Sequence, residues 1–105
     1  MDTLETPATP RMVDETLDDQ GTRCTVTRIY KTDTETVRVL VYRDTYERQS
    51  GADVHLLNSE RKWTPLVSEP VTWWHPATCH AGVRTPTVLC EVADRLITRA
   101  ALILG

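Results

Sequence analysis

The side chains with clear metal-binding or nucleophilic chemistry cluster in the run HPATCH, which contains His75, Cys79 and His80. Imidazole and thiolate groups are good zinc ligands, and a closed zinc site needs four of them. Cys24 or Cys90 would have to supply the fourth ligand from a distant part of the chain. This spacing lacks the two close ligand pairs of zinc fingers and ribbons. We therefore predict no cofactor, and keep a small metal-stabilised module as an alternative.

A catalytic cysteine is the second chemistry to consider. Cys79 or Cys90 would need a histidine base, with a third group to orient that base. No orienting carboxylate or oxyanion-type glycine loop lies nearby in the sequence, and the chain has only four glycines in all. Cys90 also falls at the border of the apolar side of a predicted helix, where packing is a simpler role. We predict that the protein is not an enzyme.

Short alternating segments predict the strands that would position these residues. They are separated by short polar connections, which favour antiparallel neighbours and therefore a meander. Pro65 places the last of them at an edge or at the start of a strand. The predicted strands are 22–30, 36–43, 52–57 and 63–67, and 71–75 could add a short fifth.

The C-terminal segment predicts an amphipathic helix from about residue 86 to 104. Thr85 and Pro86 resemble an N-cap followed by proline at the first helical position. The apolar residues on one arc are Leu89, Val92, Ala93, Leu96, Ile97, Ala100, Ile103 and Leu104. The sequence thus predicts an α+β protein, an antiparallel four- to five-stranded β-meander with this helix packed on one face.

Strand parity separates the two faces of the predicted sheet. The face expected beneath the helix contains Val26, Val37, Val39, Val41, Ala52, Val54 and Leu56. The opposite face contains Ile29, Leu40, Tyr42, His55 and Leu57, mixed with Thr25, Thr27 and Arg38. A freely solvated sheet face is normally more polar than this second set. We therefore expect something to cover the second face.

Two alternatives for that cover remain open. One is the segment 69–82 of the same chain, and the other is another chain. Trp73 and Trp74 lie in this segment, and consecutive side chains of an extended strand point to opposite sides. One of the two tryptophans should therefore face solvent, the second sheet face or a partner. We predict partner binding through Trp73, Trp74, Leu40, Tyr42, Leu57 and Ile29.

The first 21 residues differ from the rest of the chain in charge. They hold six acidic residues and one arginine, a net charge of −5, whereas residues 22–105 have a net charge of +2. Pro7 and Pro10 disfavour a helix in this part of the chain. We expect 1–21 to be an acidic arm, disordered in isolation, with at most a short helical turn near 11–17. Residues 22–105 would form a single α+β domain.

Nucleic-acid binding is an alternative function. Arginines at 23, 28, 38, 43 and 48 are interleaved with tyrosines, which could give a sheet on which bases stack. Acidic residues among them and the overall charge of −3 argue against it. Arg28 also has the parity of the helix-facing side, so we expect its charge to emerge near an edge of the sheet.

Taken together, these features predict a small non-enzymatic interaction or assembly module that binds a protein partner or forms a homo-oligomer. Three cysteines without a CxxC pair indicate a reducing compartment, and the longest apolar run is too short for a membrane span. Ten arginines against two lysines, with no phenylalanine, are typical of GC-rich coding. We therefore expect a cytoplasmic protein or a virion component, such as a phage or mobile-element subunit from a high-GC host.

Overall fold

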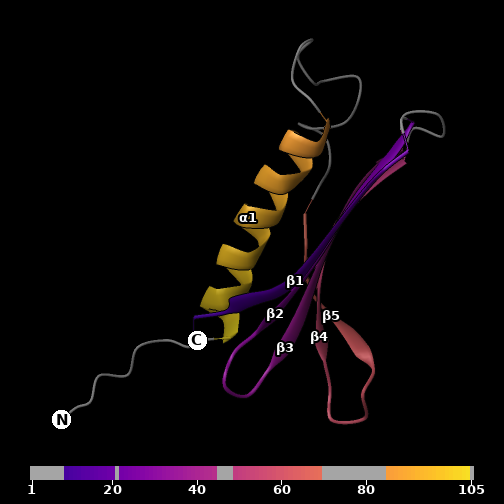
Figure 1. The fold of residues 1–105 in the computed structure, drawn as a ribbon. Coiled ribbons are helices and arrows are strands. Elements are labelled where there is room, and N and C mark those ends of the chain that lie inside the picture. Colours follow the sequence, from indigo (N-terminus) through magenta and orange to yellow (C-terminus); the bar gives the residue numbers. More distant parts are fainter. Residues whose placement is uncertain (1–8, 21, 45–48, 70–84, 105) are drawn as a thin grey trace.

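The computed structural model describes residues 9–20, 22–44, 49–69 and 85–104. Its elements are β1 (Arg11–Asp19), β2 (Arg23–Lys31), β3 (Thr36–Asp44), β4 (Gln49–Leu57), β5 (Trp63–Ser68) and α1 (Thr85–Leu104). The strands form one antiparallel sheet in the order β1-β2-β3-β4-β5, and α1 lies against one face (Figure 1). The predicted α+β meander with a C-terminal helix is confirmed. No helix in the described ranges has the length and apolar character needed to cross a membrane.

Strands β2 and β3 follow the predicted alternation closely. Along both strands, buried side chains alternate with partly exposed ones. The buried side carries β-branched residues, which pack well on a pleated surface. Val26, Val37, Val39, Val41 and Val54 are all 0% exposed. The prediction of which sheet face lies beneath the helix is therefore confirmed.

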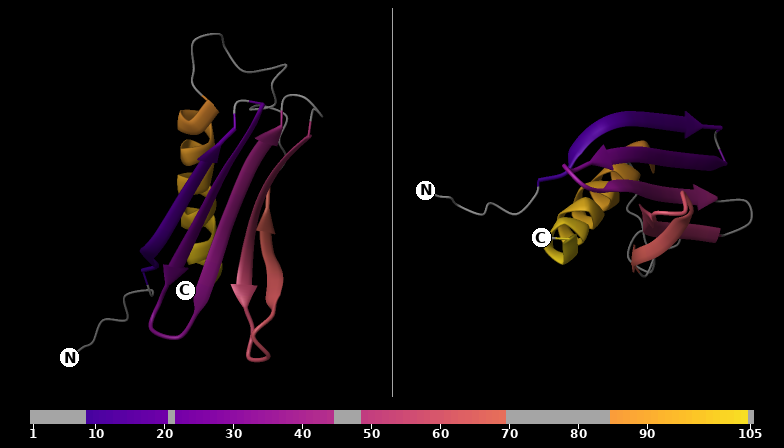
Figure 2. Two further views of the ribbon diagram at one scale, coloured as in Figure 1. Left: turned by 45° about the vertical axis from the view of Figure 1, so that its right-hand side comes forward. Right: turned by 90° about the horizontal axis from the view of Figure 1, so that it is seen from below.

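Helix α1 packs over β2 to β5 and supplies the other half of the core. Leu89, Val92, Ala93, Leu96 and Ala100 are fully buried, as the helical periodicity predicts. Each fully buried Leu or Val contributes about 1.5–3 kcal/mol. The helix runs obliquely to the strands (Figure 2). At its C-terminal end the predicted apolar arc is partly wrong, because Ile103 is 57% exposed.

Strand β1 corrects the expectation for residues 11–19, which we placed in a disordered arm with a helical turn. These residues instead pair with β2, from Arg11 opposite Lys31 to Asp19 opposite Cys24. A tight connection joins the two strands, with the Gln20 N–H donating to the Arg23 carbonyl at 2.8 Å. All nine residues of β1 are exposed, so burial does not impose the alternation that would have marked a strand.

Strand β4 begins at Gln49, three residues before the predicted start, and therefore includes Gly51. Gly51 pairs with Tyr42 of β3, whose ring lies over it. A Cβ added at Gly51 would lie 2.4 Å from Tyr42 Cε1. This glycine is thus required by the close approach of an aromatic ring within the sheet, not by a turn.

Strand β5 is the second edge of the sheet, and its Pro65 is exposed, as predicted. The possible fifth strand at 71–75 lies outside the described residues, and β1 takes the fifth place in the sheet. Just after β5, Glu69 accepts hydrogen bonds from Arg95 and from Arg99 Nη1, the latter at 3.4 Å. These contacts fasten the end of the sheet to α1.

Candidate functional site

The face of the sheet opposite α1 holds all four of the predicted partner-binding residues that the structure describes. We call it the open face, because no described element lies over it (Figure 2). Its side chains are partly exposed and belong to Thr25, Thr27, Ile29, Arg38, Leu40, Tyr42, Asp53, His55, Leu57 and Trp63. The structure therefore brings Ile29, Leu40, Tyr42 and Leu57 together on one surface. Their role in binding stays a prediction.

Two arginines stack on aromatic rings of the open face. The guanidinium of Arg38 lies 4.6 Å from the ring centroid of Trp63, and that of Arg23 lies 5.1 Å from the ring of Tyr42. Cation–π contacts of this kind are worth about 0.5–1 kcal/mol at exposed sites. They hold both arginines flat against the sheet. The open face therefore combines apolar area with positive charges in fixed positions.

His55 lies on β4, on the same face of the sheet as these arginines. Its Nδ1 is 3.5 Å from Nη2 of Arg38, the residue opposite it on β3. Burial lowers the pKa of His55, the positive charge of Arg38 lowers it further, and Asp53 acts in the opposite direction. Both leading causes favour the neutral ring, so the positive charge at this point of the face belongs to Arg38.

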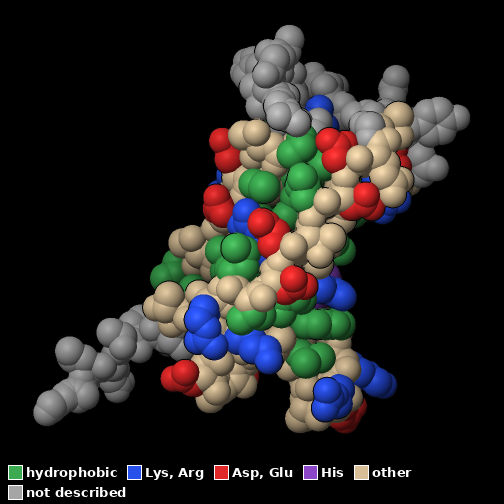
Figure 3. Space-filling view, in the orientation of Figure 1, with side chains coloured by type: hydrophobic (Ala, Val, Ile, Leu, Met, Phe, Trp, Pro, Cys, Tyr) green, Lys and Arg blue, Asp and Glu red, His purple; other side chains and the backbone are tan. Residues whose placement is uncertain are grey.

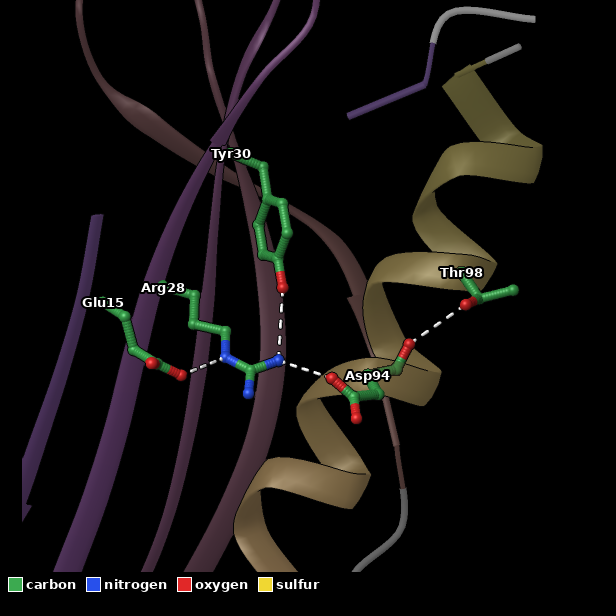
Figure 4. Close-up of polar contacts among 5 residues, drawn as sticks. All are labelled: Glu15, Arg28, Tyr30, Asp94 and Thr98. Carbon is green, nitrogen blue, oxygen red and sulfur yellow. Dashed lines mark hydrogen bonds and ion pairs between the residues drawn. The ribbon is translucent and has the colours of Figure 1, made fainter. Parts of the chain in front are cut away.

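On the helix side, Arg28 forms a buried charge cluster that the sequence did not predict (Figure 4). Arg28 is 8% exposed. Its Nε donates to Glu15 Oε2 at 2.7 Å, and its Nη1 donates to Asp94 Oδ1 at 2.6 Å and to the Tyr30 hydroxyl at 3.2 Å. Burial by itself lowers the pKa of this guanidinium, but the bonds to Asp94 and Glu15 outweigh it and raise the pKa above its ordinary value.

The cluster corrects the expectation that the charge of Arg28 emerges at an edge of the sheet. The charge is instead neutralised between the layers, by Glu15 from β1 and Asp94 from α1. A charged residue with buried parity requires such partners, because an unpaired buried charge is costly. The sequence indicates that Arg28 needs acidic partners, but it does not indicate that these are Glu15 and Asp94. The bonds described for this guanidinium all go to the chain itself, so its role is to join edge strand, sheet and helix.

The arginines predicted for nucleic-acid binding are divided between the two sides of the sheet. Arg23 and Arg38 lie on the open face, whereas Arg28 and Arg43 face the helix side and are 8% and 7% exposed. Arg48 lies outside the described residues. The predicted stacking surface therefore retains two of its described arginines.

The candidate metal and nucleophilic residues are mostly outside the described part of the chain. This holds for His75, Cys79 and His80, and also for Trp73 and Trp74. Within the ranges that the structure covers, no three His, Cys, Asp or Glu residues are placed to hold a metal ion.

The two remaining cysteines are described. Cys24 is 1% exposed, and Cys90 is half-buried and packed against the core. Burial raises the pKa of the Cys24 thiol, and Asp19, Cys90 and Asp18 raise it further, against the opposing effect of Arg43. A neutral buried thiol is a poor nucleophile and a poor metal ligand. Packing is therefore the role that the structure gives to Cys24, and Cys90 lies against the same core.

Comparison of the chain with protein-family models, with curated proteins and with solved structures gives no match.

Proposed function

We propose that the protein is a small, non-enzymatic interaction or assembly module that presents its open face to a protein partner or to a second copy of the chain. The observation that carries the proposal is the composition of that face. On this face Leu57 lies opposite Trp63, Leu40 is two residues before Tyr42 on the same side of β3, and Ile29 lies opposite Arg38, with no described element over them. Tryptophan, tyrosine and arginine are the residue types most enriched at binding hot spots.

The dimensions of the sheet support the same proposal. Five strands spaced about 4.8 Å apart and about 30 Å long present about 600 Å² of projected area, against about 800 Å² per partner in a standard interface. The two guanidinium groups held against aromatic rings lose little side-chain freedom when a partner binds, which lowers the entropic cost of association. A sheet face of this size and rigidity suits one protein partner.

A nucleic-acid-binding regulator is the second candidate, because the stacks of Arg23 on Tyr42 and Arg38 on Trp63 could accept bases. It stands behind the protein partner for a reason of charge. Strand β1, at one end of the same sheet, carries four acidic residues and one arginine and would repel a phosphate backbone. Strongly salt-dependent binding of single-stranded DNA or RNA, lost in an R23A/R38A variant, would favour this alternative.

The test of the proposal compares two kinds of variant. Leu40→Asp with Leu57→Asp places charge on the open face, whereas Leu102→Asp makes the same change at a helix residue that is 78% exposed. We expect self-association in sedimentation velocity, or complex formation with a partner from the native host, to be lost in the first variant and kept in the second. Trp73→Ala tests the predicted contribution of the tryptophan pair in the same assay.

Circular dichroism melting shows whether each variant is still folded. A protein that is monomeric at all concentrations and binds no partner, or whose association is unaffected by the folded L40D/L57D variant, would contradict the proposal. The cytoplasmic or virion location, and the origin from a phage or mobile element, remain predictions from composition alone.

A further inference from the structure

The outer edge of β1 is a strand edge without a described neighbour. Strand β1 pairs with β2 on one side, and no strand in the described ranges pairs with its other side. An edge strand leaves a row of backbone N–H and C=O groups pointing away from the sheet. The register with β2 shifts between Met12 and Asp14 and is regular from Asp14 to Asp19. The regular part is a six-residue template for an incoming strand.

The opposite edge of the sheet is less suited to pairing. Strand β5 is six residues long, carries Pro65 within it and has an irregular register with β4. Proline has no N–H to donate, and natural proteins use prolines and irregularities to protect their edges. Residues 11–19 contain neither proline nor lysine. Apart from the irregularity near Met12, the protection of β1 is its acidic side chains, including Glu15 on the helix side, and these oppose a strand of like charge but not a basic one.

The two sides of β1 differ in chemistry. Pairing with Ile29, Thr27 and Thr25 places Asp14, Thr16 and Asp18 on the open-face side. On the helix side, Leu17 is 49% exposed, because α1 covers β2 to β5. Figure 3 shows acidic side chains along the line of β1, with apolar side chains between them and α1.

Charge decides which partner fits this edge. Strand β1 carries Asp14, Glu15, Asp18 and Asp19 against Arg11, a net charge of −3. Pairing with β1 of a second copy would place two strands of this charge side by side, and like charges opposite each other are destabilising. A basic strand would instead find a carboxylate opposite each of its bases. The geometry therefore favours a basic partner over a second copy.

We propose that the free edge of β1 binds an extended basic segment of a partner protein as a sixth strand of the sheet. Backbone hydrogen bonds to the part of β1 from Asp14 to Asp18 supply the pairing. Two lysine or arginine side chains, four residues apart, lie opposite Asp14 and Asp18. An apolar side chain on the other side of the segment covers Leu17. This surface is the edge of the sheet and not its open face, so it does not depend on the proposed function above.

The test uses three synthetic peptides with the full chain. The probe acetyl-TRVTVRT-amide has arginines four residues apart. The peptide acetyl-TRPPVRT-amide keeps the charge, but one of its two adjacent prolines removes an N–H that would face β1. The peptide acetyl-TEVTVET-amide reverses the charge. We expect saturable binding of the first peptide only, at low salt. Hydrogen exchange should slow at the amides of β1. Asp14→Asn with Asp18→Asn should weaken binding about fivefold, which corresponds to two exposed charge pairs.

The matched control removes the same charge elsewhere, by Asp33→Asn with Glu60→Gln in two exposed turns. It should bind the probe as the unmodified protein does. L40D/L57D should also bind it, because Leu40 and Leu57 lie on β3 and β4 and are separated from this edge by β2. Equal binding of the proline-containing peptide, protection at β5 instead of β1, or no binding at millimolar peptide would each overturn the proposal. None of these results would affect the test of the open face.

Discussion

Neutralising the two carboxylates around Arg28 tests whether this residue is a buried charge that needs a counter-ion. Glu15→Gln and Asp94→Asn each keep an oxygen that can accept the hydrogen bond but remove the negative charge. The Glu15 side chain is 40% exposed and that of Asp94 is 70% exposed, whereas the Arg28 side chain is 9% exposed. The carboxylates can therefore be hydrated when a bond is lost, but the guanidinium cannot.

The expected free energies follow from this asymmetry. Glu15→Gln keeps a hydrogen bond to the charged guanidinium and loses the ion pair with it, which at a side chain that is 40% exposed should cost about 1 kcal/mol. Asp94→Asn should cost less, about 0.5 kcal/mol, because water screens an exposed carboxylate. With both charges removed, Arg28 becomes a buried unpaired cation, at a cost of about 3 kcal/mol or more. The double variant should therefore lose about 1.5 kcal/mol more than the sum of the two single variants.

Urea unfolding followed by circular dichroism measures these differences. With a denaturant slope of about 1.5 kcal/mol/M, the double variant should unfold at about 2 M less urea than the unmodified protein. Arg28→Met should be milder than the double variant, because it removes the buried charge and leaves the carboxylates free to hydrate. Additive effects in the double variant, within about 0.5 kcal/mol, would refute the account, as would an Arg28→Met variant less stable than the double variant.

Two further predictions concern the open face. The pKa of His55 is lower in the folded protein than the ordinary value of 6.5 for histidine, so the unfolded chain binds a proton at this residue more readily. The His55 contribution to stability should therefore be intact above pH 6.5 and lost as the pH falls below it. Urea midpoints between pH 7.5 and 5.5 should therefore fall less steeply for His55→Gln; an unchanged slope would contradict the lowered pKa. Gly51→Ala should destabilise the protein by about 1 kcal/mol, because its Cβ meets the Tyr42 ring, yet be neutral or stabilising in a Tyr42→Ala background. Thermal melts of the unmodified protein, the two single variants and the double variant show whether the effect of Gly51→Ala on stability changes sign. An equal destabilisation in both backgrounds would show that the Tyr42 ring is not the cause.

The parts of the fold that the sequence predicted are those whose side chains are sorted by burial. Val37, Val39 and Val41 alternate with partly exposed residues because one side of β3 is sealed by α1. The same exclusion of water imposes the period of Leu89, Val92 and Leu96 on the helix. Where both sides of a strand or helix are exposed to solvent, as in β1, the sequence shows no periodic alternation of polar and apolar residues.

Strand β1 and Gly51 are two features that the sequence prediction misjudged. Every residue of β1 is exposed, so its residues show no alternation of polar and apolar types that would indicate a strand. The nearby prolines and the acidic residues indicated an arm instead. The predicted strand 52–57 leaves Gly51 out, because only the Tyr42 ring on a neighbouring strand explains a glycine within the strand. Both depend on pairing with a neighbouring strand, which the pattern within one strand does not report. That pattern also does not report the partners of Arg28 or the stacking of Arg38 on Trp63.

The ion pair between Glu15 and Arg28 also determines which charges β1 presents outward. Little apolar area holds this strand, since Leu17 is about half exposed, so its order rests on backbone bonds to β2 and on the bond from Arg28. A slip of one residue in a strand exchanges its two sides. It would turn Glu15 away from Arg28 and put either Thr16, which has no charge, or the shorter Asp14 in its place. Thr16 would leave the buried cation without a carboxylate from β1, and Asp14 is one methylene shorter than Glu15, so the reach of Glu15 favours the observed register. That register keeps Asp14 and Asp18 on the side where a basic strand can reach them.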